Sequence, residues 1–274
     1  MLKISELFIY PIKSLGGISL QQAEVTDRGF KFDRRWMLVD NNNRFLTQRD
    51  FAVMALLKVS LADDGLLVTY TGDGSKTLIP FEPLKKDLIE VTVWDDTCNG
   101  QLVSDETDAW FTQKLNINCR LVYMPDDSHR PTDSRYTDDG QVTSFSDGYP
   151  FMMIGQASLE ELNGRMVQPL GIDRFRPNIV FTGGEAFEED LIDEFTINNI
   201  RFKGVKLCAR CVMTTIDQTT GTKGKDPLKT LTSYRLKNNK IYFGQNVVHS
   251  GTGVINVGDE LNVLSTHKEE RFII

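Results

Sequence analysis

The stretch Leu207-Cys208-Ala209-Arg210-Cys211-Val212-Met213-Thr214-Thr215-Ile216-Asp217 joins a β-rich run to two thiols that flank an arginine. The β-branched residues after Cys211 favour extended chain, so a strand is expected over residues 206–216. A cation beside a thiol favours the thiolate, the form that binds metals or attacks electrophiles, and soft thiolates suit soft metal centres. The stretch therefore predicts β structure and singles out Cys211 as a candidate for thiolate chemistry.

The C-x-x-C pair by itself is also compatible with three common roles of paired cysteines. A structural zinc site needs four ligands, but Cys98 and Cys119 do not form a second pair, and the three histidines (His129, His249 and His267) stand singly. A thioredoxin-like redox pair is expected at a helix start, where the sequence here predicts a strand. Free cysteines are also often small buried hydrophobes, which is the simplest interpretation of the pair taken by itself.

Composition places the chain among ordinary globular proteins. Its 274 residues carry a net charge of −7, with 25% charged and 40% hydrophobic residues, which argues against nucleic acid or an anionic membrane as a partner. Four scattered cysteines are typical of a reducing compartment. The N-terminus lacks a signal-peptide pattern, and no apolar stretch approaches the roughly 20 residues of a membrane span. A cytoplasmic location without membrane attachment is expected.

The first hundred residues predict mainly strands. Asp, Asn and Gly clusters at 40–43 and 63–65 favour turns, so hairpins are expected over 36–47 and 57–71. Other strands are expected at 3–12 and 89–94. Residues 105–115 change to a helical period, with Ser104 or Asp105 as the N-cap. The domain boundary is expected just before this helix, which gives a β-rich domain over 1–100 and a second domain over 104–268.

The second domain predicts short strands after a long polar loop. Residues 125–148 lack periodicity, which is typical of an active-site lid or of a mobile surface loop. A buried strand is expected at 151–154, and Ser158-Leu159-Glu160-Glu161 matches a capping box that opens a helix. Further strands are expected at 175–182, 195–202, 206–216, 240–248 and 254–264. The fold class is therefore mainly β with some helix (α+β), with a barrel or sandwich core.

Basic residues adjoin turn-forming residues at several expected strand ends: Lys13-Ser14, Asp33-Arg34-Arg35-Trp36, Gln48-Arg49 and Arg174-Phe175-Arg176-Pro177-Asn178. Such cations could converge on an anion, because Arg offers phosphate a bidentate fork and Lys a point charge. Each one alone is more often a solvated surface cation. The chain has neither a Walker A run nor G-x-G-x-x-G, so an anionic ligand would be held by side chains and strand ends.

Six segments, in order, resemble the MOSC family with its N-terminal β-barrel-like domain, and within it the amidoxime-reducing branch of mitochondria and bacteria. They are Tyr10-Pro11-Ile12-Lys13-Ser14, Asp33-Arg34-Arg35-Trp36, Ser146-Asp147-Gly148-Tyr149-Pro150-Phe151, Gln156-Ala157-Ser158-Leu159, Arg174-Phe175-Arg176-Pro177-Asn178-Ile179 and Cys208-Ala209-Arg210-Cys211. The resemblance covers nearly the whole chain, and the motifs are specific when taken together. It implies a C-terminal MOSC β-barrel that carries the metal-ligand cysteine.

The resemblance also implies a molybdenum cofactor, Mo-molybdopterin, with Cys211 as the metal ligand and catalytic residue. Family positions that hold the cofactor fall on Lys13, Ser14, Arg34, Arg176, Asn178 and Ser158. The implied activity is reduction of N-hydroxylated compounds, namely amidoximes, hydroxylamines and N-hydroxy bases. Pyridoxal phosphate binding is a further property associated with the family.

Two features depart from the family pattern. Eukaryotic relatives often have serine after the first cysteine, where this chain has Ala209. Some bacterial relatives add an iron–sulfur domain with C-x₄-C-x₂-C spacing, whereas residues 271–274 end this sequence without such cysteines. Electrons are therefore expected from a separate ferredoxin-, flavodoxin- or cytochrome-type protein. Two alternatives stay open: a sulfur-carrier or molybdenum cofactor delivery protein, and a β-barrel module that binds another anion.

Overall fold

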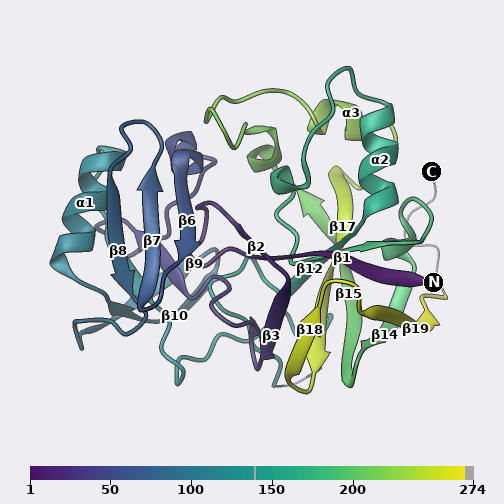
Figure 1. Cartoon of the computed structure of the whole chain (residues 1–274), viewed down its shortest axis with the longest axis horizontal. Coiled ribbons are helices and arrows are strands. Elements are labelled where there is room, and N and C mark those ends of the chain that lie inside the picture. Colours follow the sequence, from purple (N-terminus) through teal and green to yellow (C-terminus); the bar gives the residue numbers. More distant parts are fainter. Residues whose placement is uncertain (139, 269–274) are drawn as a thin grey trace.

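The computed structural model describes residues 1–138 and 140–268, and Figure 1 shows a barrel beside a smaller β-rich part. Seven strands form the barrel, and the antiparallel pairing of β12 with β17 closes it. In order around the ring they are β12 (Phe151–Gly155), β13 (Ile179–Thr182), β1 (Leu2–Ile9), β19 (Glu260–Thr266), β14 (Ile192–Ile197), β15 (Ile200–Arg210) and β17 (Lys240–Ser250). Closure pairs both edges of every strand in the ring. Two short strands extend it: β2 (Ile18–Leu20) pairs with β1, and β16 (Leu236–Lys237) pairs with β17.

Aromatic side chains fill the barrel because alternate residues of each strand point inward. Phe195 and Phe202 stack with ring centroids 5.1 Å apart, and Phe151 meets Phe202 edge-on at 5.6 Å. All three are at most 1% exposed. Burying each such side chain contributes about 1.5–3 kcal/mol. The helices α2 (Gln156–Gly164) and α3 (Leu228–Thr232) pack on the barrel strands, α2 on β12 and β13, and α3 on β17.

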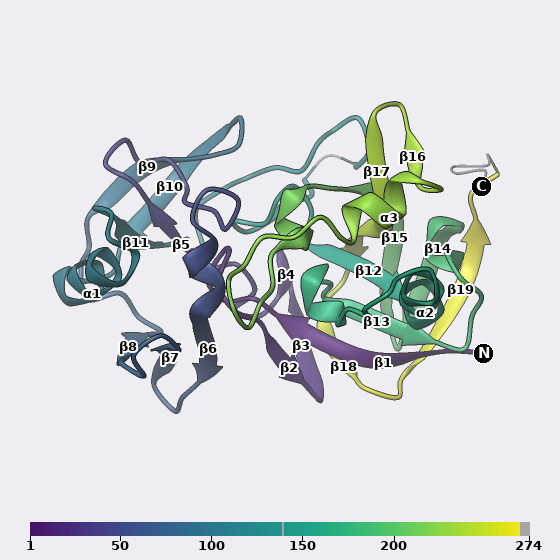
Figure 2. The ribbon, with the colours of Figure 1, turned by 90° about the horizontal axis from the view of Figure 1, so that it is seen from above.

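The barrel is completed by the start of the chain. β1 pairs with β13 through Leu7 opposite Ile179, and with β19 through Leu2 opposite Leu261. The chain then leaves the barrel at Tyr10 and enters the smaller part (Figure 2). Residues directly after β1 therefore lie where the two parts meet.

The smaller part is built of two antiparallel sheets, and the helix α1 (Asp105–Leu115) packs on one strand of each. A third small sheet lies against the barrel instead, because its residues Ala23, Val25, Phe30 and Ile255 are buried in the barrel's apolar core. One sheet of the smaller part contains β5 (Trp36–Val39), β11 (Arg120–Tyr123), β10 (Asp96–Leu102) and β9 (Leu88–Val93). The other contains β6 (Leu57–Leu61), β7 (Gly65–Tyr70) and β8 (Lys76–Pro80). The small sheet against the barrel contains β18 (Gly253–Asn256), β3 (Gln22–Thr26) and β4 (Gly29–Phe30). Trp36, Val68 and Phe111 are fully buried in one apolar core. Elements from early and late in the chain thus share sheets, and the division into 1–100 and 104–268 stays a prediction.

The mainly β fold with few helices is confirmed, and so are several single elements. The helix spans Asp105–Leu115, and the Ser104 hydroxyl accepts a hydrogen bond from the Thr107 amide as its N-cap. The hairpin predicted over 57–71 is β6 and β7. The strands predicted at 89–94 and 151–154 are β9 and β12.

Other expectations were wrong, mainly where tight turns interrupt a β-rich run. The strand predicted over 195–202 is the hairpin β14–β15, with Asn198 in the left-handed region (φ 53°), and the strand predicted over 254–264 is β18 and β19. The strand predicted over 175–182 begins only at Ile179. The second arm predicted at 44–47 forms isolated bridges instead of a strand.

Two wrong expectations concern the site. The strand predicted over 206–216 ends at Arg210, and Val212–Thr215 form a 3-10 helix because the hydroxyls of Thr214 and Thr215 bond to nearby carbonyls. The capping box is absent: α2 begins at Gln156 with Gly155 as its N-cap, so Ser158 lies inside the helix. Within residues 1–138 and 140–268, no helix has the length and apolar character needed to cross a bilayer.

Candidate cofactor-binding site

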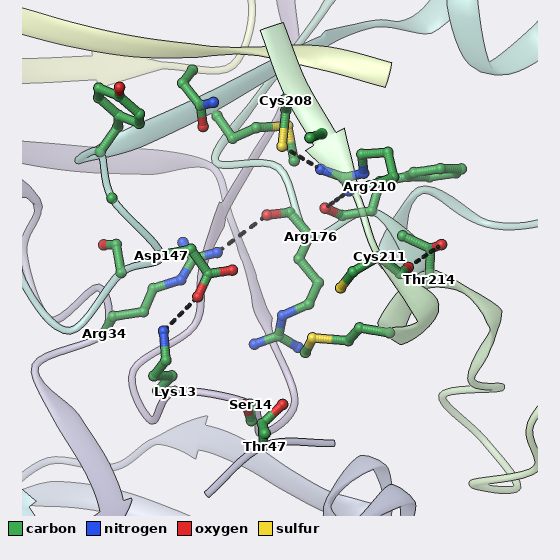
Figure 3. Close-up of a pocket in the computed structure, with 18 of the residues that line it drawn as sticks. Lys13, Ser14, Arg34, Thr47, Asp147, Arg176, Cys208, Arg210, Cys211 and Thr214 are labelled. Carbon is green, nitrogen blue, oxygen red and sulfur yellow. Dashed lines mark hydrogen bonds and ion pairs between the residues drawn. The ribbon is translucent and has the colours of Figure 1, made fainter. Parts of the chain in front are cut away.

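Cys211 lies directly after β15, in extended conformation (φ −116°, ψ 177°). Its carbonyl accepts hydrogen bonds from the Thr214 amide (3.2 Å) and from Thr214 Oγ1 (3.0 Å), which fixes the turn into the 3-10 helix. The residue is exposed, and in Figure 3 its sulfur faces the same open space as the Arg176 guanidinium. The thiol is therefore accessible to a ligand in that space.

The other thiol of the pair has a different environment. Arg210 Nη1 lies 2.8 Å from Cys208 Sγ, and Arg210 Nη2 donates to the Phe175 carbonyl. The arginine between the two thiols thus contacts Cys208. Three residues of extended chain span about 10 Å, which exceeds the Cα separation of about 7 Å that a disulfide tolerates. A redox-active disulfide between Cys208 and Cys211 does not fit this geometry.

Lys13 and Ser14 stand where the chain leaves the barrel after β1. Lys13 Nζ donates to the Phe145 carbonyl (2.8 Å) and pairs with Asp147 Oδ1 (2.5 Å). Burial lowers the pKa of Lys13 to about 8, although the Asp147 carboxylate opposes this shift. Ser14 has φ 68°, in the left-handed region that few residues other than glycine adopt. Gln48 Nε2 holds its carbonyl at 2.7 Å.

Arg34 and Arg176 pack on the buried ring of Tyr10, with guanidinium carbons 4.3 and 4.2 Å from the ring centroid. Arg34 Nη1 pairs with the buried Asp33 carboxylate at 2.7 Å, and Arg34 Nη2 donates to the Arg176 carbonyl at 3.2 Å. Burial and the neighbouring Arg34 charge lower the pKa of Arg176 to about 10. Both arginines have positive φ, 50° and 57°. Strain of this kind clusters at ligand-binding sites.

Asn178 joins these arginines to the barrel. Its Oδ1 accepts hydrogen bonds from Arg34 Nη1 (3.1 Å) and from the Met152 amide (3.3 Å), while Nδ2 donates to the Phe8 carbonyl (3.2 Å). The side chain is 2% exposed. It therefore fixes Arg34 relative to β1 and β12.

One cleft between the two parts brings together almost all of the residues predicted for the site (Figure 3). It encloses about 880 Å³, including its open mouth. The predicted residues that line it are Lys13, Ser14, Arg34, Arg176, Asn178 and Cys211. Ser158 is not among its lining residues: this side chain is fully buried, donates to Glu189 Oε2 (2.7 Å) and accepts from the Phe187 amide (2.7 Å).

The cleft also contains residues that sequence reasoning did not assign. Asp147 lies in the segment 146–151 that carried the resemblance, but nothing in the sequence pointed to its pairing with Lys13. Trp94, at the end of β9, donates from Nε1 to Asp147 Oδ1 (3.2 Å), and the Arg49 guanidinium carbon lies 4.0 Å from its ring centroid. Arg174 and Arg49 stand at predicted strand ends, which is the one signal that could have found them.

The donor set fits an anionic cofactor that brings most of its metal's ligands with it. A buried lysine and several half-buried arginines line the same cleft as the exposed Cys211 thiol, and two buried polar atoms of the lining, Arg210 Nε and Tyr149 OH, have no hydrogen-bond partner among the described residues. In residues 1–138 and 140–268, no group of three or more His, Cys, Asp or Glu side chains could hold a metal ion. A metal here would therefore depend on one protein thiolate and on ligands from outside the chain.

Comparison with known proteins assigns both parts of the chain. Residues 1–118 match the MOSC N-terminal beta barrel domain, and residues 140–262 match the MOSC domain. The mitochondrial amidoxime-reducing component 1 of Mus musculus is 33% identical over 95% of this chain and 82% of its own length. The mitochondrial amidoxime reducing component 2 of Bos taurus is 36% identical over 85% of this chain and 72% of its own length.

Similarity to solved structures is much lower. The crystal structure of YiiM from Geobacillus stearothermophilus aligns with 43% of this chain and 55% of its own, at a TM-score of 0.33 and 14% identity, too low to bear on the fold. The two domain matches and the extent of the sequence similarity together show that this chain belongs to the MOSC-domain family that includes the mitochondrial amidoxime-reducing components.

Proposed function

We propose that this protein is a molybdenum-cofactor-dependent oxidoreductase that reduces N-hydroxylated compounds: amidoximes, hydroxylamines and N-hydroxy bases. The observation that carries the proposal is the cleft itself, in which an exposed thiol faces three buried or half-buried cations. Relatives named for amidoxime reduction, similar over most of their length, support the same activity. The predicted cytoplasmic location stays a prediction.

Each lining residue has a role that its geometry permits. Cys211 Sγ would hold the metal, because it is the accessible thiol at the cleft. Lys13, Arg34 and Arg176 would neutralise the anionic groups of molybdopterin, and their partial desolvation strengthens such pairing. Lys13 has three donors, of which two are used by Phe145 and Asp147, so one remains for a ligand.

The remaining predicted residues would position these groups. Asn178 holds Arg34, and Ser14 presents its hydroxyl where the chain enters the cleft. Ser158 would act at a distance, through the contacts that fix α2 beside β12.

The proposed reaction consumes two electrons and two protons, cleaves the N–O bond, and yields the N–H product and water. When bound, the molybdenum cofactor supplies the two-electron redox chemistry. The chain's own residues bind and orient, and the cleft opens to solvent at its mouth, from which protons can be drawn. A separate electron-transfer protein of ferredoxin, flavodoxin or cytochrome type would deliver the electrons.

The test is molybdenum and pterin content after expression in a cofactor-proficient host, for wild type, Cys211→Ala and Cys208→Ala. We expect near-stoichiometric metal in wild type, loss in Cys211→Ala, and retention in Cys208→Ala, which serves as the matched control. Wild type should then reduce an amidoxime with a reduced viologen dye as donor.

Two outcomes would contradict the proposal. Metal that passes readily to an apo-enzyme, without amidoxime reduction, would indicate a cofactor delivery or sulfur-carrier protein. Molybdenum and pterin absent from all three proteins would indicate a module that binds a different anion.

A further inference from the structure

Asp147 is the acidic side chain in a cleft that is otherwise strongly basic. Among the described lining residues one is acidic and six are basic: Lys13, Arg34, Arg49, Arg174, Arg176 and Arg210. Three of these cations are already assigned to an anionic cofactor. A single carboxylate in such surroundings is suited to a ligand group that donates a hydrogen bond.

The Asp147 carboxylate is oriented through one oxygen and open at the other. Lys13 Nζ (2.5 Å) and Trp94 Nε1 (3.2 Å) both donate to Oδ1. Within residues 1–138 and 140–268, no donor lies within hydrogen-bond distance of Oδ2, and the side chain is 75% exposed. Figure 3 shows the group beside Lys13 with its second oxygen directed into the cavity. Oδ2 is therefore a fixed acceptor available to a ligand.

The backbone on the N-terminal side of Asp147 is held firmly. Arg130 is 1% exposed, and its Nη1 donates to the carbonyls of Ser144 (2.8 Å) and Ser146 (2.6 Å). A side chain on a backbone that buried hydrogen bonds hold in place can discriminate between ligands, because little conformational entropy is lost when they bind.

We propose that Asp147 determines substrate specificity by accepting a hydrogen bond from the amino group next to the N–OH group, which favours N-hydroxyamidines and N-hydroxyguanidines over substrates without that N–H donor. The proposal rests on the proposed function and deepens it. Amidine-type groups are planar and match a carboxylate acceptor, and rejection of analogues without the donor follows from the unpaired acceptor they leave behind.

The test is binding of benzamidine and of methyl benzoate, an aromatic analogue without an N–H donor, to the protein as isolated, measured by calorimetry for wild type, Asp147→Asn and the control Asp95→Asn. Asp95 is exposed one residue after Trp94 and does not line the cleft. We expect the Kd for benzamidine to rise at least about tenfold in Asp147→Asn, as for loss of a charged hydrogen-bond partner. The Kd should stay unchanged in Asp95→Asn, and methyl benzoate should bind all three proteins equally weakly.

Metal and pterin content of the same samples separates this inference from the proposed function. Equal benzamidine affinity in wild type and Asp147→Asn, or no binding to wild type, overturns the role of Asp147. Loss of pterin in Asp147→Asn also overturns it, because the carboxylate would then serve only to hold Lys13. Selective loss of benzamidine binding in protein that never contains molybdenum would instead overturn the proposed function and leave the recognition by Asp147 standing.

Discussion

Replacing Arg130 with methionine should strongly destabilise the protein through the loop 125–148. The guanidinium is 1% exposed and donates to two backbone carbonyls, those of Ser144 and Ser146. It also pairs with Asp96 at 2.9 Å. Methionine fills much of the same volume but leaves both carbonyls without a donor.

The magnitude follows from these partners. Each buried carbonyl left unpaired costs about 1–3 kcal/mol. The Asp96 side chain is 49% exposed, so its lost ion pair costs about 0–1 kcal/mol. The expected loss is about 2–7 kcal/mol, a large share of the roughly 5–15 kcal/mol that stabilises a typical domain.

Equilibrium urea unfolding measures this loss, with Arg135→Met as the matched control in the same loop. Arg135 is 77% exposed and pairs with Asp133, so its replacement should change the free energy of unfolding by less than about 0.5 kcal/mol. A loss below about 1 kcal/mol for Arg130→Met, with an unchanged urea dependence, would show that the loop does not depend on this side chain. It would then behave as the mobile surface loop that the sequence left open.

Three further predictions concern pH and packing. Burial lowers the pKa of His249 below 6.5, so the stability that comes from the neutral ring is fully present above pH 6.5 and is lost as the pH falls below 6.5. The melting temperature of His249→Gln should therefore depend less on pH in the acid range than that of wild type. Identical pH profiles of the two proteins would contradict this role of His249. Because Lys13 has a pKa of about 8, the affinity of wild type for pyrophosphate, measured by calorimetry, should fall as the pH rises through 8. An equal fall in affinity in Lys13→Met would exclude this lysine as the cause. A Cβ on Gly17 would lie 2.4 Å from Tyr10 Cε1, so Gly17→Ala should cost about 1–3 kcal/mol, and a melting temperature equal to wild type would refute the clash.

Local patterns in the sequence were enough to predict elements that depend on nearby residues. Ser104 and the apolar stripe of 105–115 specify α1, and the Asp63-Asp64-Gly65 turn specifies the hairpin of β6 and β7. Both depend on interactions between residues close in the chain, which propensity and periodicity capture. The prediction failed where side chains compete for the backbone, as in the threonines that turn Val212–Thr215 into a 3-10 helix.

The sequence by itself determined the β class and the family resemblance, since these depend on residue types and their order, and it singled out Cys211 as a candidate. Only the tertiary structure decided which charged and polar side chains of the site contact one another. Lys13 reaches Asp147 across 134 residues, and Arg34 reaches Asn178 across 144. It also decided that Ser158 is buried against Glu189, outside the lining of the cleft. Such contacts depend on how β1 closes the barrel and how the loop 125–148 packs. Long-range packing of this kind has no signature in the local pattern of one sequence, because its energy comes from partners far along the chain.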